Sequence, residues 1–351
     1  MSDAAALMLV SARVDLRLRG EVADGLRPCP EYLELERHHG IELLDWSRLP
    51  GDVGGRSSRL SLLHVAVALL RRPGREVIFS DGEHLAIPLG LALRSLGGGP
   101  RHLALGHHLT SRIKPFLLRG LRGAGIDRLL VHSRTQQAIA TRRLGLDPRR
   151  VAFLPYYADA SFWRPGAASA GENLVLAVGR EHRDYTTFAT AVEGLPLHVQ
   201  IAAGSLHSPG AVCRLPRSFP PNVQVGMLGL GELRHRYAAA TVVVVPLLSN
   251  DFQAGITTIL EAMAMGKAVV VTATEGQRDV VVHGETGLLV PPGDPEALKD
   301  ALRGLIANPR QRRRLGENAR EAVLRNYDLP IYAARLAAHI SDLGQVGRAV
   351  A

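Results

Sequence analysis

The segment TVVVVPLLSNDFQAGITTILEAMAMGKAVVVT, residues 241–272, decides the fold of this chain. It begins and ends with short, continuous apolar runs, residues 242–245 and 268–271, which are typical of strands buried on both faces of a parallel sheet. Between them a polar loop that contains Gly255 leads into a sequence with helical character. The segment therefore predicts one strand–helix–strand unit of an α/β protein.

The same alternation recurs outward from this segment along the chain. Further apolar runs lie at residues 7–10, 76–79, 103–105, 129–131, 174–178 and 199–203. Helix-compatible sequence separates most of them, which favours parallel sheets with crossover helices. Prolines and small residues at 155–171 interrupt the pattern and are typical of a linker.

We therefore expect two doubly wound Rossmann-like domains that face each other across a cleft. The N-terminal domain would comprise residues 1–165 and the C-terminal domain residues 166–328, with ligands bound outside the carboxyl ends of the strands. A C-terminal helix, residues 329–351, could pack back on the N-terminal domain.

Composition excludes several other classes of protein. The 351 residues include only two cysteines, Cys29 and Cys213, so neither a disulfide framework nor a thiolate zinc cluster can form. No apolar run approaches the ~18–20 residues of a bilayer span, and no basic lead-in marks a secretory signal. We expect a cytoplasmic protein with no metal site.

Positive charge is concentrated in the first half of the chain. The net charge is +9, and the 11 Lys and Arg residues between Arg101 and Arg150 face only Asp127 and Asp147. Such a region could attract an anionic membrane surface or a phosphorylated ligand. The basic, apolar stretch 112–122 could lie peripherally at the inner membrane surface. Nucleic-acid binding is not expected, because no interleaved aromatic platform is present.

The loop and helix at 250–267 carry the strongest functional signal. A helix that begins near Thr257 or Thr258 after Gly255 presents unpaired backbone N–H groups and a positive dipole end, which together bind phosphate. Glu261, about one turn into the helix, could accept hydrogen bonds from both hydroxyls of a ribose. An N-terminal-turn glutamate that merely complements the helix dipole is the alternative.

Residues 250–267 and their continuation through 268–272, 275–281 and 283–295 resemble the C-terminal domain of family 4 glycosyltransferases. These are retaining enzymes with the GT-B fold. Residues 178–185 resemble the glycine–arginine turn of that family, and residues 154–165 resemble its interdomain connection. The resemblance covers roughly residues 100–325. It implies a nucleoside diphosphate sugar as donor substrate, bound by the C-terminal domain, and no cofactor. It also implies that the N-terminal domain binds the acceptor.

The resemblance also implies roles for residues of the C-terminal half. The second acid of the family's two-carboxylate motif falls on Glu261, which would hold the ribose. The first falls on Gln253, which departs from the pattern and would contact the transferred sugar without a charge. Arg180 and Arg183 would bind the diphosphate and stabilise the departing charge. An ordinary solvated arginine is the alternative for each of them. Backbone amides of Gly255, Ile256 and Thr257 would lie near the diphosphate or the sugar.

In the N-terminal half, His107 and His108 directly follow the apolar run 103–105. The family commonly has a histidine here, close to the reacting sugar, and either of the two could match it. Residues 80–84 also follow a run and could orient an acceptor hydroxyl, or could form a capping turn.

The sequence thus predicts a metal-independent, retaining hexosyltransferase of carbohydrate or glycoconjugate biosynthesis. It would move a sugar from a nucleoside diphosphate to a hydroxyl of a small molecule, glycan or lipid-linked acceptor. The alternatives are a nucleoside diphosphate sugar 2-epimerase of the same fold and a membrane-surface binding protein. A nicotinamide oxidoreductase is excluded because no Gly-x-Gly-x-x-Gly follows a strand.

Overall fold

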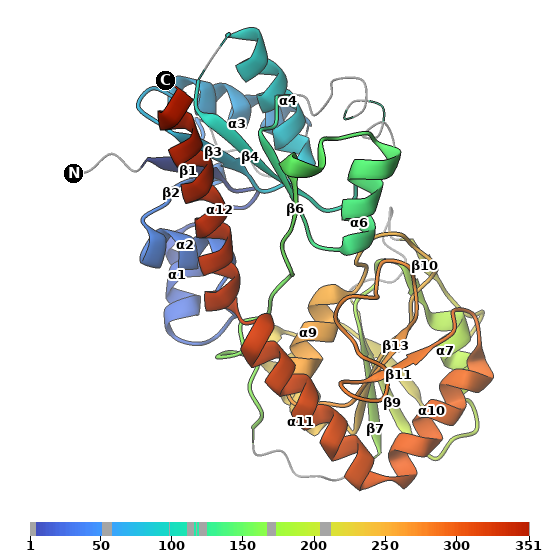
Figure 1. Cartoon of the computed structure of the whole chain (residues 1–351). Helices are drawn as coiled ribbons and strands as arrows, with labels where there is room; N and C mark the ends of the chain where they lie inside the picture. The colour runs from blue at the N-terminus through green and yellow to red at the C-terminus, as the bar shows by residue number, and fades with distance from the viewer. Residues whose placement is uncertain are drawn as a thin grey trace. The chain divides into compact units, whose positions relative to one another are not determined.

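The computed structural model describes residues 5–50, 58–97, 99–110, 116, 118, 125–166, 173–203 and 212–350 (Figure 1). The chain forms two compact units. Unit 1 comprises Met1–Ala23, Cys29–Pro155 and Pro330–Ala351, and unit 2 comprises Asp24–Pro28 and Tyr156–Leu329. Each unit contains a six-stranded parallel sheet, which confirms the prediction of an α/β fold with two parallel-sheet domains. The boundary at residue 165 stays a prediction.

Unit 1 has the strand order β2-β1-β3-β4-β5-β6. Its strands are β1 (Ala6–Leu9), β2 (Glu42–Leu44), β3 (Val77–Ser80), β4 (Arg101–Gly106), β5 (Arg128–Val131) and β6 (Val151–Phe153). Its described helices are α1 (Leu16–Ala23), α2 (Glu31–His39), α3 (Ser58–Leu70), α4 (Glu83–Ser95), α6 (Arg134–Ala138) and α12 (Leu329–Val350), with the short turns η1 (Trp46–Arg48), η2 (Ile139–Arg143) and η3 (Pro148–Arg150).

Unit 2 has the strand order β11-β9-β7-β12-β13-β14 and a separate parallel pair, β10-β8. Its strands are β7 (Leu174–Val178), β8 (Arg183–Asp184), β9 (His198–Ala202), β10 (Cys213–Arg214), β11 (Val223–Gly226), β12 (Val242–Val245), β13 (Val269–Thr272) and β14 (Leu288–Val290). Its described helices are α7 (Tyr185–Val192), α8 (Leu230–Ala239), α9 (Ile256–Ala264), α10 (Pro295–Ala307) and α11 (Pro309–Asn326).

The strand orders locate the crevice where each sheet binds ligands. In unit 2 the first strand, β7, lies between β9 and β12, so the chain winds outward in both directions from the β7/β12 pair. In unit 1 the equivalent position lies between β1 and β3. Loops that leave the carboxyl ends of such a pair diverge to opposite faces and leave a crevice. The loops after β7 and β12, and those after β1 and β3, are therefore where functional residues are expected.

Local sequence signals explain several helix boundaries. The Asp294 side chain accepts a hydrogen bond from the Ala297 amide at 2.9 Å, and Pro295 is the first residue of α10. This capping arrangement satisfies an otherwise unpaired amide. Helix α12 has a buried apolar face, which consists of Tyr332, Leu336, Ile340 and Leu343.

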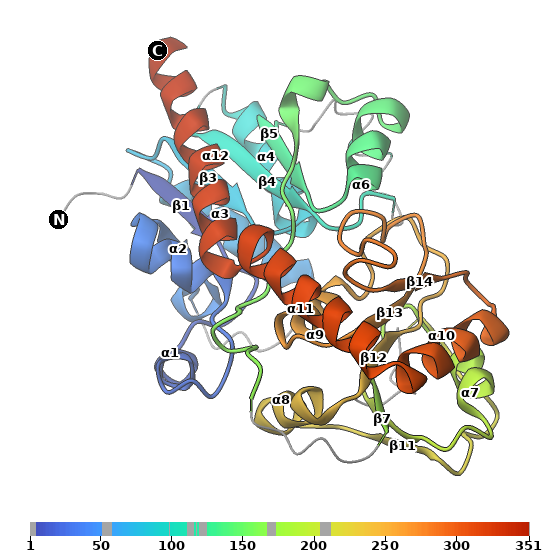
Figure 2. The ribbon, with the colours of Figure 1, turned by 60° about the horizontal axis from the view of Figure 1, so that its bottom comes forward.

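Helix α11 packs tightly beside α9 in unit 2, as both views of the ribbon show (Figures 1 and 2). The approach depends on a glycine. A Cβ atom added at Gly316 of α11 would lie 2.2 Å from the carbonyl oxygen of Gly266, which is backbone and cannot move aside. Helix α11 thus rests on the turn that ends α9.

We expect Gly316→Ala to lower the free energy of unfolding by about 1–3 kcal/mol, because the methyl group overpacks this contact. Gly304→Ala in α10 is the matched control. Gly304 is exposed and has nothing within 4 Å of an added Cβ, so alanine there should stabilise by about 0.5–1 kcal/mol through its helix propensity. Urea unfolding measures both variants, and equal effects would contradict the packing argument.

The expectations about membranes can be compared with the described residues alone. Within them, no helix has both the length and the apolar character needed to span a bilayer. Apart from Phe116 and Leu118, the basic stretch 112–122 lies outside the described residues.

Candidate functional site

The turn that follows β7 has an unusual backbone. Gly179 has φ 94°, and His182 has φ 53°, the one left-handed residue other than glycine among the described residues. Such a conformation costs free energy and persists only where the surroundings fix it. Two backbone hydrogen bonds do so, from the His182 amide to Val212 and from the Leu248 amide to His182, and the His182 ring meets the Phe252 ring edge-on at 4.8 Å.

This turn directs Arg183 into the interior of unit 2. Its Nε and Nη2 atoms donate to the carbonyl oxygen of Val178 at 3.0 and 2.9 Å, and Nη1 donates to that of Glu181 at 2.8 Å. Nη2 also donates to the Thr258 hydroxyl at 3.3 Å. These four bonds leave one of the five guanidinium N–H groups, on the nitrogen Nη1 that lies beside Gly255.

The charge of Arg183 is poorly compensated. The side chain is 3% exposed, and burial lowers the pKa of its guanidinium from the ordinary value. No carboxylate among the described residues forms an ion pair with it, whereas neighbouring Asp184 pairs with Arg214 at 3.2 Å. A buried cation without a carboxylate partner favours the binding of an anion close by.

The loop after β12 forms the other side of the crevice and leads to the amino end of α9. Gly255, with φ 78°, is the N-terminal cap of α9, and the first amides of that helix have no partners within it. A Cβ atom at Gly255 would lie 2.9 Å from Val245 and 3.0 Å from Nη1 of Arg183. The two loops of the switch point therefore bring a buried guanidinium to the amino end of a helix, where anions bind.

Gln253 lies in the same loop with an unsatisfied amide. It is 9% exposed, and neither its Oε1 nor its Nε2 atom has a hydrogen-bond partner among the described groups. Two hydrogen bonds from residues 276 and 277 fix the backbone of this loop. The Gln277 side chain donates to the carbonyl oxygen of Ala254 at 2.6 Å, and the Gly276 amide donates to the carbonyl oxygen of Asn250 at 3.2 Å. A fixed, buried amide without partners is suited to a polar ligand.

Glu261 points from the second turn of α9 toward α8. Its Oε2 atom accepts a hydrogen bond from the hydroxyl of the buried Tyr237 at 2.9 Å. Burial raises the pKa of the Glu261 carboxyl to about 8, and the Tyr237 hydrogen bond opposes that rise.

The structure thus brings together most of the residues that the sequence singled out in unit 2. Arg183, Gln253, Gly255 and Glu261 lie on the two loops of the switch point and on α9, with Ile256 buried and Thr257 exposed at the start of the helix. Arg180 directly follows Gly179 and is exposed.

A second polar cluster lies at the switch point of unit 1. The Ser11 hydroxyl, after β1, donates to Asp81 Oδ1 at 2.6 Å and lies 2.8 Å from His84 Nε2, and the Ser11 amide also donates to Asp81. Burial raises the pKa of the Asp81 carboxyl to about 6. The segment 80–84 therefore carries a polar network and is more than a capping turn.

Glu83 organises the loop that holds the two predicted histidines. Its Oε1 atom accepts hydrogen bonds from the amides of His107 and His108, at 2.9 and 2.8 Å, and Glu83 is 5% exposed. His107 is exposed, with Nε2 2.8 Å from the carbonyl oxygen of Asp81, while His108 is half-buried. The histidine loop is thus fixed to the start of α4.

We expect Glu83→Ala to loosen this loop, because two partly buried amides lose their acceptor at a combined cost of about 1–3 kcal/mol. Glu83→Gln is the control, since its amide oxygen can still accept both bonds. The Ala variant should lower the melting temperature by several degrees and speed amide exchange in peptides that contain residues 106–109. Slow exchange there in Glu83→Ala would contradict the assignment.

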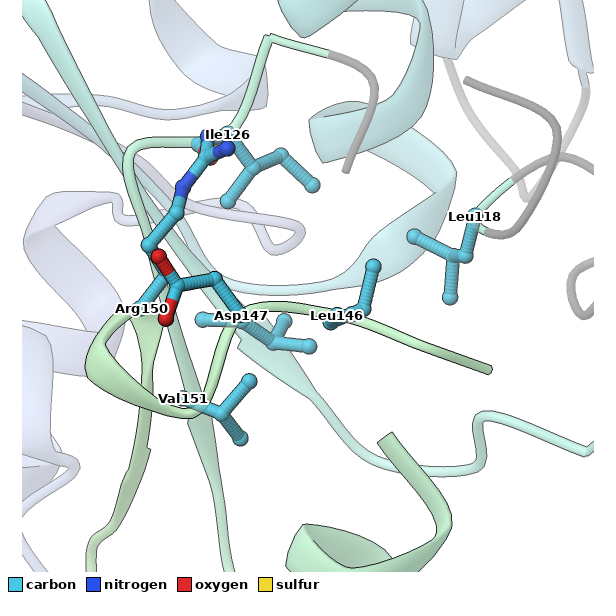
Figure 3. A pocket seen from close by; sticks show the side chains of 7 residues that line it. Leu118, Ile126, Leu146, Asp147, Arg150 and Val151 are labelled. Atoms are coloured by element: carbon cyan, nitrogen blue, oxygen red, sulfur yellow. The ribbon is translucent and has the colours of Figure 1, made fainter. Parts of the chain in front are cut away.

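A small apolar cavity elsewhere in unit 1 does not compete with these sites. Its volume of about 20 Å³ suits at most a water molecule. Figure 3 shows mainly aliphatic side chains around it; the lining residues are Leu118, Ile126, Leu129, Leu146, Asp147, Arg150 and Val151.

Several contacts in the two sites have no signal in the sequence. Tyr237 and Thr258 complete the surroundings of Glu261 and Arg183, and Ser11 meets Asp81 across 70 positions of chain. Tyr237 is one aromatic residue in an ordinary helix, so only its contacts reveal it.

Part of this chain is similar in sequence to known proteins. Residues 217–322 match the family model described as "Glycosyl transferases group 1". The D-inositol 3-phosphate glycosyltransferase of Frankia alni is 31% identical over 229 residues, which are 56% of this chain and 54% of that protein. The exopolysaccharide phosphotransferase SCO2592 of Streptomyces coelicolor is 29% identical over 60% of this chain and 24% of its own length. The chain thus spans about half or less of the length of these curated relatives.

Solved structures show the same fold over nearly the whole chain. Sucrose-phosphate synthase from Thermosynechococcus elongatus superposes with a TM-score of 0.74 at 21% identity, covering 97% of this chain and 99% of that one. Anabaena Alr3699/HepE, in complex with UDP and glucose, gives a TM-score of 0.69 at 14% identity, covering 97% and 100%. The chain therefore has the GT-B fold, and the match to the group 1 glycosyltransferase model lies within unit 2.

Proposed function

We propose that this chain is a retaining glycosyltransferase of the family 4 type, which transfers a sugar from a nucleoside diphosphate to an acceptor hydroxyl. The observation that carries the proposal is the buried, carboxylate-free Arg183 beside Gly255 at the amino end of α9. A diphosphate fits there, because backbone amides and a guanidinium offer complementary donors. The HepE structure with bound UDP supports the nucleotide as ligand class.

The roles of the residues follow from the site. The free N–H of Arg183 and the first amides of α9, at Gly255, Ile256 and Thr257, would bind the diphosphate, with Arg180 reaching it from the exposed end of the turn. Glu261 would accept from the ribose hydroxyls, and Gln253 would hydrogen-bond the sugar. This set supplies positive charge without a metal or a cofactor.

The proposed reaction breaks the bond between the anomeric carbon and the diphosphate oxygen and forms a bond to the acceptor oxygen on the same face. The acceptor proton passes to the departing phosphate. Fixed donors at α9 and Arg183 stabilise the negative charge that develops on the leaving group. Our candidates for acceptor recognition lie in unit 1 and are His107, His108 and the Ser11–Asp81–His84 cluster. The proposed acceptor is a hydroxyl of a small molecule, a glycan or a lipid-linked molecule. Peripheral contact with the inner membrane surface is also part of the proposal.

A thermal-shift screen with UDP-, GDP-, dTDP- and ADP-glucose tests the donor site. A ligand that binds only the native state at 100 times its Kd adds about 2.7 kcal/mol of stability, so one of the four should raise the melting temperature clearly. No response to any of them would contradict the proposal. Incubating the responsive donor without an acceptor then separates the transferase from the epimerase alternative, because an epimerase converts the sugar by itself.

Gln253→Ala should separate sugar binding from nucleotide binding. We expect it to leave the affinity for the free nucleoside diphosphate unchanged and to weaken the sugar conjugate about tenfold, the worth of roughly one hydrogen bond. The free variant should melt no lower than the wild type, because a buried amide without partners is removed. Equal weakening for both ligands, measured by calorimetry, would place Gln253 at the nucleotide instead.

A further inference from the structure

A chain of hydrogen bonds runs beneath the start of α9 and connects the two ends of the nucleotide site. Arg183 Nη2 donates to the Thr258 hydroxyl at 3.3 Å. The Thr258 hydroxyl also interacts with Tyr237, where it opposes the rise in the pKa of the buried phenol. Tyr237 in turn donates to Glu261 Oε2 at 2.9 Å. Thr258 and Tyr237 are 5% and 0% exposed, so the middle of the chain is closed to water.

The chemistry of its ends fixes the direction of every bond. A guanidinium only donates, and the Glu261 carboxylate, once ionised above its pKa of about 8, only accepts. In that state each hydroxyl between them accepts from the arginine side and donates toward the glutamate side. Bonds aligned in one direction in a low-dielectric interior polarise and strengthen one another. The buried cation and the carboxylate thus share two hydroxyls, although no direct ion pair joins them.

The packing of α8 against α9 places the Tyr237 hydroxyl between Thr258 and Glu261. Thr258 and Glu261 are three positions apart on α9 and so project from the same face of the helix. Tyr237 reaches that face from α8, and its ring is held edge-on by Trp163 at 5.5 Å. The ring position is therefore fixed by packing, and the hydroxyl alone supplies the bonds.

We propose that Tyr237 is a positioning residue of the nucleotide site, which holds the Glu261 carboxylate ready for the ribose and links it through Thr258 to Arg183 at the diphosphate. The inference rests on the proposed function. It predicts that the Tyr237 hydroxyl controls the proton equilibrium of Glu261, and hence the pH at which the nucleotide binds.

Few charged groups face Glu261 from the surrounding elements. Tyr237 of α8 is the titratable side chain in contact with it, and Arg183 acts through Tyr237. Helix α11 contributes Arg320, which donates to the Ala264 carbonyl oxygen. Strands β12 and β13 contribute only valines and one threonine.

The test is the pH profile of binding, measured by calorimetry with whichever of UDP-, GDP-, dTDP- or ADP-glucose binds the wild type. A sugar conjugate is chosen because its phosphates do not titrate near neutral pH, unlike a terminal phosphate. The ionised carboxylate accepts best from ribose hydroxyls, so the affinity of the wild type should rise between about pH 6.5 and 8.5 and then level off, since burial raises the pKa of Glu261 to about 8. In Tyr237→Phe the profile should move up by about one pH unit, which weakens binding about tenfold at pH 7.5.

Further variants show whether the hydroxyl chain or mere packing is responsible. Thr258→Val, which interrupts the chain without touching Glu261, should move the profile in the same direction, and Thr258→Ser should restore it. Tyr327→Phe is the control, because the Tyr327 hydroxyl donates to the Asp279 carbonyl at 3.2 Å elsewhere in unit 2, and its profile should equal that of the wild type.

The outcomes separate the two proposals. An upward shift in Tyr237→Phe or, if that variant does not fold, in Thr258→Val supports the positioning role. A wild type that binds with a profile unchanged in both variants overturns it and leaves the proposed function standing. A wild type that binds none of the four conjugates overturns both.

Discussion

Glu261→Ala is expected to abolish the rise in melting temperature that a nucleoside diphosphate sugar produces in the wild type. Two ribose hydroxyls lose a charged acceptor, and each such bond is worth about 1.5–3 kcal/mol. That loss exceeds the ~2.7 kcal/mol that a ligand at 100 times its Kd contributes. The free variant should remain folded, because the substitution removes a carboxyl whose ionisation burial disfavours. A full ligand response in Glu261→Ala would remove this residue from the site.

The same carboxylate should affect stability with a definite sign. Its pKa is raised from 4.5 to about 8 in the folded protein, so between these values the folded state binds a proton that the unfolded state has lost. Glu261 therefore makes its full contribution to the free energy of unfolding below pH 4.5, and this contribution decreases as the pH rises toward 8. Glu261→Gln cannot titrate, so its melting temperature should fall less than that of the wild type over this range.

Arg183→Met is expected to affect both stability and binding. The substitution leaves the carbonyl oxygens of Val178 and Glu181 without their donor, which should lower the free energy of unfolding by about 2–4 kcal/mol. It also removes the buried charge beside the amino end of α9, so diphosphate affinity should fall at least tenfold.

Arg214→Met is the matched control for this variant. Arg214 also lies in unit 2 and pairs with Asp184, but its side chain is 59% exposed, and such ion pairs contribute only about 0–1 kcal/mol. Urea unfolding and calorimetry compare the two. Equal effects would mean that burial of Arg183 has no special consequence.

The interior of both sheets could be predicted from the sequence, whereas their edges could not. All eight continuous apolar runs correspond to interior strands, β1, β3, β4 and β5 in unit 1 and β7, β9, β12 and β13 in unit 2. The edge strands β2, β6, β11 and β14 were missed, and they have at most four residues each. In β11, two of the four residues are exposed. A strand with one open side needs no continuous apolar run, so periodicity does not reveal it.

The candidate site shows a similar division. Gly255, Gln253 and Glu261 belong to one local segment whose spacing is visible in the sequence. The partners of Arg183 and Glu261 come from elsewhere in the chain, so Thr258 and Tyr237 appear only once β7, β12 and α8 are assembled. The sequence predicts that Arg183 binds the diphosphate. In the structure most of its N–H groups instead donate to backbone carbonyl oxygens of the protein. The role of its remaining N–H is a prediction.

Hydrogen–deuterium exchange of the segment Gly255–Glu261 tests the central claim most directly. A diphosphate at the amino end of α9 should accept from its first amides, which have no partner within the helix. At saturating concentration of the nucleoside diphosphate that binds, peptides containing residues 255–258 should show the strongest slowing of exchange in unit 2. Unchanged exchange there, while the same ligand still raises the melting temperature and protects another part of the chain, would show that the nucleotide binds elsewhere.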